Sequence, residues 1–105
     1  AMPAPVSQLS TVAFEQITVA ASAIGLTVAN VRGYGSNRFA AEKAVVFVET
    51  APIRWRDDGT DPTTTVGMIA NPGTVLTFDN RDRLEKFRAI RTGSTSATLS
   101  VTYLA

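Results

Sequence analysis

The sequence predicts an all-β protein: an antiparallel β-sandwich, jelly-roll-like, of seven or eight short strands with at most one short helix near residues 80–87. Thr, Val and Ile often alternate with polar residues, a pattern typical of half-buried strands. Gly, Pro and Asn recur between these apolar stretches at the spacing that short strands need. Only residues 80–87 have the spacing of a helix. Together these observations favour a sandwich or a small barrel over any helical fold.

Short strands are expected over three stretches of the first half of the chain: 11–19, 23–28 and 44–49. The first has a phase slip, because Val12 and Phe14 fall on one face whereas Ile17 and Val19 fall on the other. A β-bulge or a crossing between two sheets would explain the slip. The stretch 44–49, AVVFVE, is almost continuously apolar. It is therefore predicted to be a central strand that is covered on both faces.

In the second half, strands are expected over 53–57, 66–70, 74–78, 88–92 and 97–105. Pro52 marks a turn, so 53–57 is predicted to pair with 44–49 in a hairpin above a core Trp55. NPG at 71–73 is predicted to form a tight turn that joins 66–70 to 74–78 as a second hairpin. In the last strand, Leu99, Val101 and Tyr103 fall on one face.

The helical segment is NRDRLEKF, residues 80–87. Asp79 or Asn80 is expected to cap its N-terminus, and Leu84 and Phe87 have the spacing of one buried helix face. No second helix is expected. Residues 1–9 are expected to form an N-terminal arm, and residues 10–105 a single β-sandwich domain, as suits a chain of 105 residues.

Composition excludes several kinds of function. The net charge of +1 gives little attraction for nucleic acid or anionic lipid, so neither partner is expected. The chain has no Cys and no His. It therefore lacks the usual metal ligands, thiol nucleophile and general base, and no catalytic residue, cofactor or metal is expected.

The most unusual stretch is APIRWRDDGTDPTTTVG, residues 51–67. One interpretation is structural: Asp57 to Gly59 form a turn, and two arginines on one strand face pair with the aspartates. A second is a calcium site on Asp57, Asp58 and Asp61, which the nearby arginines oppose. A third is a contact surface, since Trp and Arg are enriched at interfaces. The candidate partner-contact residues are Arg54, Arg56, Asp57, Asp58, Asp61, Arg32, Tyr34 and Arg38.

Other candidate sites carry weaker signals. Residues 31–39, VRGYGSNRF, lack the spacing of a phosphate-binding loop and are expected to be a surface loop. An acid/base pair of carboxylates has no recognisable context, although several are available: Glu15, Glu42, Glu49, Asp79, Asp82 and Glu85. Sugar binding with Trp55 or Tyr34 as a stacking platform is a further alternative.

Residues 53–78, IRWRDDGTDPTTTVGMIANPGTVLTF, and 84–104, LEKFRAIRTGSTSATLSVTYL, resemble small uncharacterised proteins that tailed bacteriophages encode among their structural genes. The similarity covers about the last 60 residues. The matching residues are 54–60, 62–67, 87–90 and 97–103.

The resemblance implies a non-enzymatic virion protein, above all a capsid decoration (cement) protein that binds and reinforces the head. The implied partners are further copies of the chain, as a dimer or trimer, and capsid or other virion proteins. The alternative is a carbohydrate- or receptor-binding module of a tail fibre or tail tip. An exposed Trp55 beside a groove would favour that alternative, whereas a buried Trp55 together with a loop docked on protein would favour the decoration protein.

Overall fold

Two antiparallel four-stranded sheets form the fold in the computed structural model, which describes residues 10–33 and 40–105. The expected arm, residues 1–9, lies outside the described residues. The first sheet has the order β1-β8-β3-β6 and consists of β1 (Thr11–Val19), β8 (Ala97–Leu104), β3 (Lys43–Glu49) and β6 (Val75–Phe78). The second has the order β2-β7-β4-β5 and consists of β2 (Ile24–Gly25), β7 (Arg88–Arg91), β4 (Ile53–Arg56) and β5 (Met68–Ala70). Two short helices are α1 (Val28–Arg32) and α2 (Arg81–Lys86).

The strand order is that of a jelly roll. Along the chain, each strand lies in the opposite sheet from the one before it, except that β4 is followed by β5 in the same sheet. Eight strands wound between two sheets in this way define the jelly-roll architecture. The predicted all-β sandwich is therefore confirmed.

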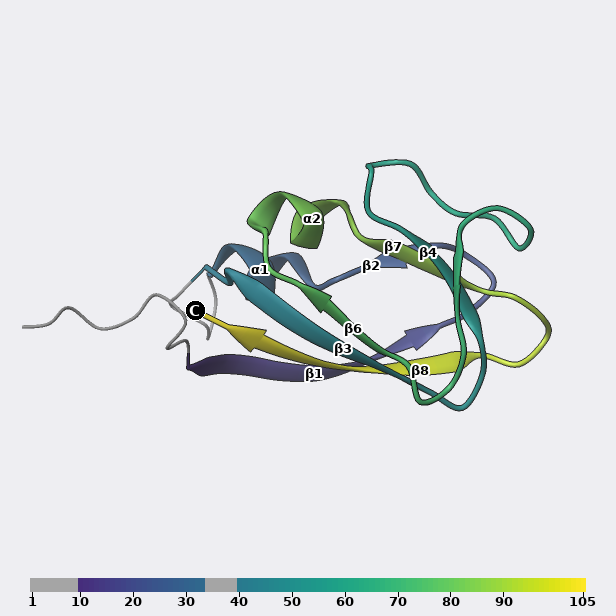
Figure 1. Cartoon of the computed structure of the whole chain (residues 1–105), viewed down its shortest axis with the longest axis horizontal. Coiled ribbons are helices and arrows are strands. Elements are labelled where there is room, and N and C mark those ends of the chain that lie inside the picture. The colour runs from purple at the N-terminus through teal and green to yellow at the C-terminus, as the bar shows by residue number, and fades with distance from the viewer. Residues whose placement is uncertain (1–9, 34–39) are drawn as a thin grey trace, which may run out of the picture.

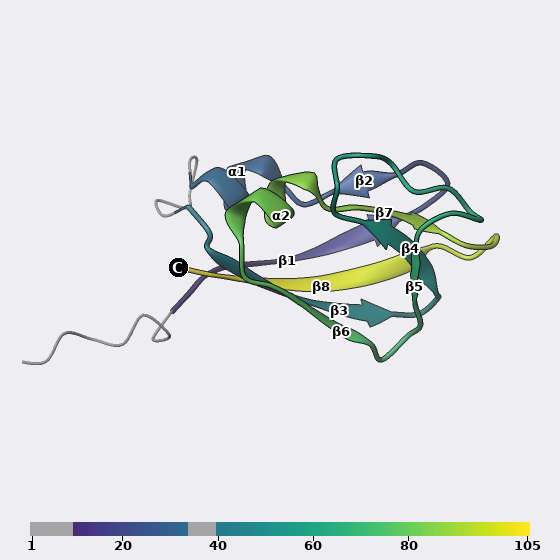
Figure 2. The ribbon, with the colours of Figure 1, turned by 45° about the horizontal axis from the view of Figure 1, so that its top comes forward.

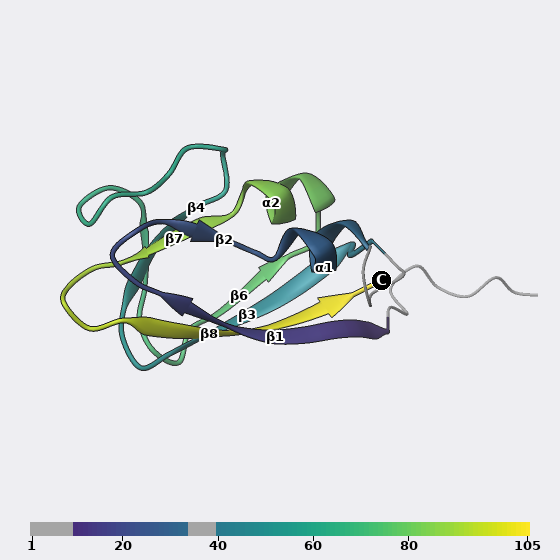
Figure 3. The ribbon, with the colours of Figure 1, turned by 180° about the vertical axis from the view of Figure 1, so that it is seen from behind.

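The second sheet and the two helices together cover the inner face of the first sheet. In Figure 2, β2, β7, β4 and β5 lie over one end of the long strands, and α1 and α2 lie over the other end. Figure 1 shows the two helices side by side, and they contact each other. The loop between β4 and β5 projects away from the second sheet, begins beside α2, where Asp57 contacts Arg83, and extends toward the end of the sandwich far from the C-terminus (Figure 3).

The core lies between these layers and follows from strand alternation. Along β8, every second side chain is buried, including Leu99, Val101 and Tyr103, as the sequence predicts. Toward α2, aromatic rings fill the space: the Phe78 and Phe87 rings lie 5.2 Å apart. Burial of each such side chain contributes about 1.5–3 kcal/mol to the free energy of unfolding.

The predicted helix at 80–87 is confirmed. The side chain of Asn80 accepts a hydrogen bond from the Asp82 N–H at 2.8 Å and so caps α2. Leu84, within α2, and Phe87, directly after it, are both buried. The chain then continues as β7, as expected.

Both predicted hairpins are wrong. β3 pairs with β8 and β6, whereas β4 pairs with β5 and β7, so the chain crosses from one sheet to the other around Pro52. The NPG turn itself is present, with a hydrogen bond from the Thr74 N–H to the Asn71 carbonyl of 3.0 Å and a φ of 93° at Gly73. It too joins strands of opposite sheets. Turn residues specify a reversal of the chain, and crossing to the facing layer buries the inner side of both strands.

Two further expectations about single elements are corrected. β3 is central in its sheet but covered on one face only, because its burial alternates and Phe47 is 40% exposed. The expected strand at 23–28 shortens to β2, and α1 begins at Val28, so the structure has two helices rather than one at most. The reason is packing. Leu26, just before α1, and Val31, within α1, are both buried in the core, and the helix directs the Val31 side chain inward.

The phase slip in β1 has a polar cause. A register irregularity lies between Thr11 and Ala13, and from Ala13 on alternate residues face inward. Glu15 takes one of these inward positions, so the apolar pattern is interrupted there. Its carboxylate accepts hydrogen bonds from the hydroxyl of Tyr103, from Thr27 at 2.5 Å and from the Asn30 amide at 3.0 Å. The slip therefore combines a bulge with one hydrogen-bonded inward carboxylate.

Candidate functional site

A groove of about 580 Å³ lies beside the unusual stretch of the sequence. It is bounded by the end of β4, the loop of residues 57–67 (the 57–67 loop), the start of β5 and the helix α2. Its lining residues are Trp55, Arg56, Asp57, Asp58, Val66, Gly67, Met68 and Arg83. We call this feature the Trp55 groove.

Trp55 forms an apolar wall of the groove. Its indole packs edge-on against Phe78, with ring centroids 5.3 Å apart, and stacks with Phe87 at 6.0 Å. The side chain is only half-buried, so Trp55 is not the enclosed core residue that the sequence predicts. Met68, its register partner on β5, is 62% exposed, and Val66 is 52% exposed. A rigid aromatic ring thus lies beside two accessible aliphatic side chains.

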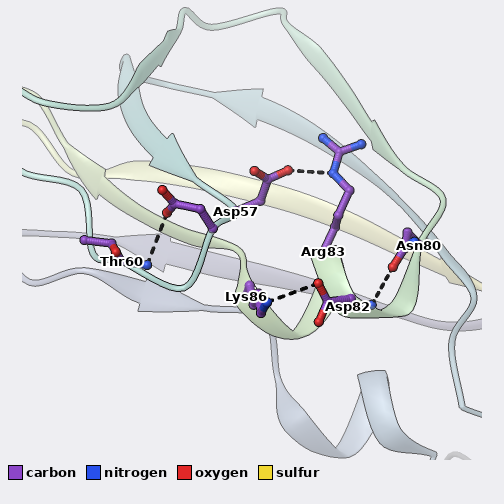
Figure 4. Close-up of polar contacts among 7 residues, drawn as sticks. Asp57, Thr60, Asn80, Asp82, Arg83 and Lys86 are labelled. Carbon is purple, nitrogen blue, oxygen red and sulfur yellow. Dashed lines mark hydrogen bonds and ion pairs between the residues drawn. The ribbon is translucent and has the colours of Figure 1, made fainter.

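Two ion pairs form the polar side of the groove. Arg83 donates from Nε to an Asp57 carboxylate oxygen at 2.6 Å, and its guanidinium carbon lies 4.9 Å from the centre of the Phe78 ring. Figure 4 shows Asp57 and Arg83 pointing toward each other from the loop and from α2. Arg56 contacts both carboxylate oxygens of Asp58, at 3.1 and 2.5 Å. This hydrogen bonding raises the pKa of Arg56 and lowers that of Asp58, so both remain charged at neutral pH.

Local hydrogen bonds shape the 57–67 loop. An Asp58 oxygen accepts from the Thr60 N–H at 3.2 Å, which is the predicted turn in which an aspartate bonds the backbone two residues on. The hydroxyl oxygen of Thr63 accepts from the Val66 N–H at 2.9 Å. The backbone also closes on itself, with the Thr63 N–H donating to the Val66 carbonyl at 2.9 Å. The loop thus satisfies much of its own hydrogen bonding.

Arginine side chains from β4 and β7 hold this loop against the second sheet. Arg54 donates to the carbonyls of Thr64 and Gly67, at 3.1 and 2.8 Å, rather than pairing with an aspartate. Arg88, on β7, donates to the Asp61 carboxylate at 2.8 Å. The predicted pairing of arginines with aspartates is therefore confirmed for Arg56, whereas Arg54 binds the backbone.

At Gly67, the start of β5 lies close to β4 and to the middle of the 57–67 loop. Its φ is +138°, a conformation that residues with a side chain rarely adopt. An added Cβ would lie 3.1 Å from the Pro62 Cβ, 3.2 Å from the Arg54 Cβ and 3.3 Å from the Trp55 carbonyl. The loop is packed against β4 at this point, and glycine is required there.

The structure brings together only part of the predicted contact set. Arg56, Asp57 and Asp58 line the Trp55 groove, whereas Asp61 binds Arg88 outside its lining. Arg32 lies at a separate crevice of about 230 Å³ between α1 and α2, where it pairs with Glu85 at 2.9 Å. Tyr34 and Arg38 lie outside the described residues.

The calcium interpretation gains no support from the geometry. Asp57, Asp58 and Asp61 each bind a different arginine, and their carboxylates do not converge on one point. Within residues 10–33 and 40–105, no group of three or more acidic side chains is placed to hold a metal ion.

Sequence reasoning missed three groove residues: Arg83, Gly67 and Met68. Arg83 directly precedes the buried Leu84 on a short helix, and nothing in the local sequence places that helix against the 57–67 loop. Met68 was assigned to a strand, and its position beside Trp55 depends on the pairing of β4 with β5. Residues 66–70, VGMIA, do not alternate between apolar and polar side chains, so no local signal indicates that Met68 is exposed or which residue lies beside it.

A second candidate surface is the outer face of the sheet β1-β8-β3-β6, which points away from the core. Its exposed apolar side chains are Phe14 at 61%, Phe47 at 40% and Val75 at 55%. Phe47 and Val75 are register partners on adjacent strands. The other outward positions are mainly Thr, Ser, Val and Gln, and the charged ones are Lys43 and Glu49 at the two ends of β3. We call this surface the outer face.

Comparison with protein-family models, curated proteins and solved structures finds no match to this chain. The resemblance to bacteriophage proteins therefore stays an expectation from the sequence. Among the described residues, neither helix has the length or the apolar character to span a membrane.

Proposed function

We propose that this chain is a non-enzymatic structural protein of a tailed-bacteriophage particle, most specifically a capsid decoration protein that binds the head surface and reinforces it. The observation that carries the proposal is the outer face, with Phe14, Phe47 and Val75 exposed among hydroxyl-bearing side chains. The sequence resemblance supplies the class of particle. The virion is the corresponding location.

The chemistry of the outer face indicates the kind of partner. Its two charged side chains, Lys43 and Glu49, are opposite in sign, and Glu49 also accepts a hydrogen bond from the Ser100 hydroxyl. Strongly charged partners gain little there, whereas an apolar protein surface gains by covering the exposed rings. A capsid surface or another copy of this chain, as a dimer or trimer, fits that description.

The jelly-roll fold is compatible with this role but does not decide it. The architecture occurs in viral capsid domains and in lectins, which bind sugars. Fold alone does not identify a function, so the argument depends on the surfaces. On the outer face, Phe47 and Val75 are paired on adjacent strands, whereas Phe14 lies on edge strand β1 and is separated from them by β8.

The proposal is tested with one matched pair of variants. Val75 on edge strand β6 and Ile69 on edge strand β5 are both 55% exposed, and they lie on different sheets. We expect Val75→Lys to weaken binding to capsids and any self-association by about tenfold or more, because it places a charge in an apolar contact. Ile69→Lys should leave both unchanged.

Two measurements read the result: light scattering coupled to size exclusion at tens of micromolar, and co-sedimentation with heads assembled from the capsid protein of the source phage. A protein that is strictly monomeric and leaves such heads unbound would contradict the proposal. Equal losses in the two variants would place the contact elsewhere than on the outer face.

A second candidate function is a carbohydrate- or receptor-binding module of a tail fibre or tail tip. It is favoured by one observation, that a half-buried Trp55 lines a groove. This function uses another part of the molecule than the outer face, and the two functions do not exclude each other.

A further inference from the structure

We infer that the Trp55 groove binds a neutral saccharide, with Trp55 and Met68 against the ring of the sugar and Asp57 and Arg83 on its hydroxyl groups. The inference rests on the second candidate function, the binding module, and names its ligand class. It does not depend on docking through the outer face. The groove volume of about 580 Å³ falls within the range of small-ligand sites, roughly 300–1,000 Å³.

The apolar wall suits the C–H face of a pyranose ring. Contacts to Phe78 and Phe87 hold the Trp55 indole from behind, while the half-buried ring keeps part of its surface accessible. A ring held in place loses little conformational freedom when a ligand packs against it. Met68, 62% exposed on the neighbouring strand, extends this wall.

The polar side of the groove suits vicinal hydroxyl groups. An ionised carboxylate accepts at about four lone-pair positions, and a guanidinium has five N–H donors. Among the described residues, Asp57 receives one hydrogen bond, from Arg83 Nε. Each partner therefore retains capacity, so one hydroxyl can donate to Asp57 while its neighbour accepts from Arg83.

Charge balance decides between a saccharide and charged ligands. The groove carries two arginines and two aspartates, which are matched in two ion pairs. A phosphate or a cation would have to compete with a carboxylate or a guanidinium already in place. A ligand with many hydroxyls and no net charge adds hydrogen bonds without breaking either pair.

Trp55 is itself the reporter for the test, because it is the single tryptophan of the chain. Its fluorescence is followed while maltotetraose, cellotetraose, mannotetraose and tetra-N-acetylchitotetraose are added in turn to millimolar concentration. We expect a saturable change with at least one of the four. Flat titrations with all four, confirmed by unchanged backbone amide NMR spectra, would overturn the inference.

Asp57→Asn and Asp61→Asn form the matched pair of variants. Both aspartates lie in the 57–67 loop and both bind an arginine, but only Asp57 lines the groove. We expect about tenfold weaker binding for Asp57→Asn, the loss of one hydrogen bond to a charged group, and no change for Asp61→Asn. Equal weakening in both would mean that the loop, rather than the groove, is responsible, and would contradict the inference.

Two further variants separate folding and docking from binding. Met68→Ala removes an exposed apolar contact and should weaken saccharide binding while leaving thermal unfolding unchanged. Val75→Lys on the outer face should leave the saccharide titration unchanged. If no saccharide binds while Val75→Lys still abolishes capsid docking, the saccharide inference fails and the proposed structural role stands.

Discussion

The outer face and the Trp55 groove both expose apolar side chains, but they are held in different ways. On the outer face, Phe14 and Phe47 extend from β1 and β3 with side chains 61% and 40% exposed. In the groove, Trp55 is backed by two aromatic rings, and the loop beside it is tied by three ion pairs. The difference teaches that exposure alone does not define a site. The outer face offers area to a partner, whereas the groove offers a shape fixed in advance.

The largest expected difference in stability between the two regions comes from replacing one aromatic residue in each. Trp55→Ala removes the contacts to Phe78 and Phe87 and should lower the free energy of unfolding by about 3 kcal/mol. Phe14→Ala, at a side chain 61% exposed, should change it by less than about 0.5 kcal/mol. Urea denaturation of both variants measures the difference. Similar losses would mean that the outer face is part of the stabilising packing.

A smaller loss of stability is expected from a substitution that strains the backbone of the 57–67 loop at Gly67. Gly67→Ala places a Cβ against Pro62 and Arg54 at a φ of +138°, and should cost about 2 kcal/mol. Gly93→Ala is the control, since its added Cβ meets nothing within 4 Å, and it should be nearly neutral. Thermal unfolding compares the two. A neutral Gly67→Ala variant would show that the loop is adaptable and that the groove is not fixed in advance.

The smallest effect concerns the sheet behind the outer face, where Glu15 joins β1 to the start of α1. Burial raises the pKa of this carboxyl, but hydrogen bonds from Thr27, Tyr103 and Asn30 outweigh it, so the pKa lies below its usual value of 4.5. A depressed folded-state pKa stabilises the protein above the unfolded value, and this contribution is lost as the pH falls through the folded value. Stability should therefore decline below about pH 4.5.

The variant Glu15→Gln isolates this contribution from that of the other carboxylates. Its free energy of unfolding should fall less steeply than that of the unmodified protein between pH 5 and the acid limit of the measurement. Denaturant titrations at several pH values give the two slopes. Identical slopes would show that Glu15 keeps the same affinity for protons when the chain unfolds.

How much of the fold follows from sequence is best seen in particular elements. The alternation in β8 places Leu99, Val101 and Tyr103 inward without any knowledge of the partner strands. In β3, the same kind of argument fails for Phe47, because an apolar residue can face outward wherever a surface is left uncovered. Glu15 is the opposite case, a charged residue facing inward whose partners, Tyr103 above all, come from distant segments.

The candidate site divides in the same way. Arg56, Asp58 and Thr60 are two residues apart in sequence, and their contacts follow from strand and turn geometry. Arg83 and Asp57 are 26 residues apart, and their contact exists because α2 lies beside the end of β4. Short-range chemistry is therefore readable from sequence, whereas the groove itself is not.

The sequence by itself determined the all-β class, the faces of β8, the capped helix α2, the NPG turn and the near-neutral charge. Each depends on side-chain pattern or on interactions a few residues apart. Only the tertiary structure decided that β3 and β4 lie in different sheets, that Trp55 lines a groove, and that Arg83 closes one side of it. The physical reason is that backbone hydrogen bonds between strands are alike for almost any pair. Burial of the whole core, rather than any local signal, selects which strands pair and which side chains remain outside.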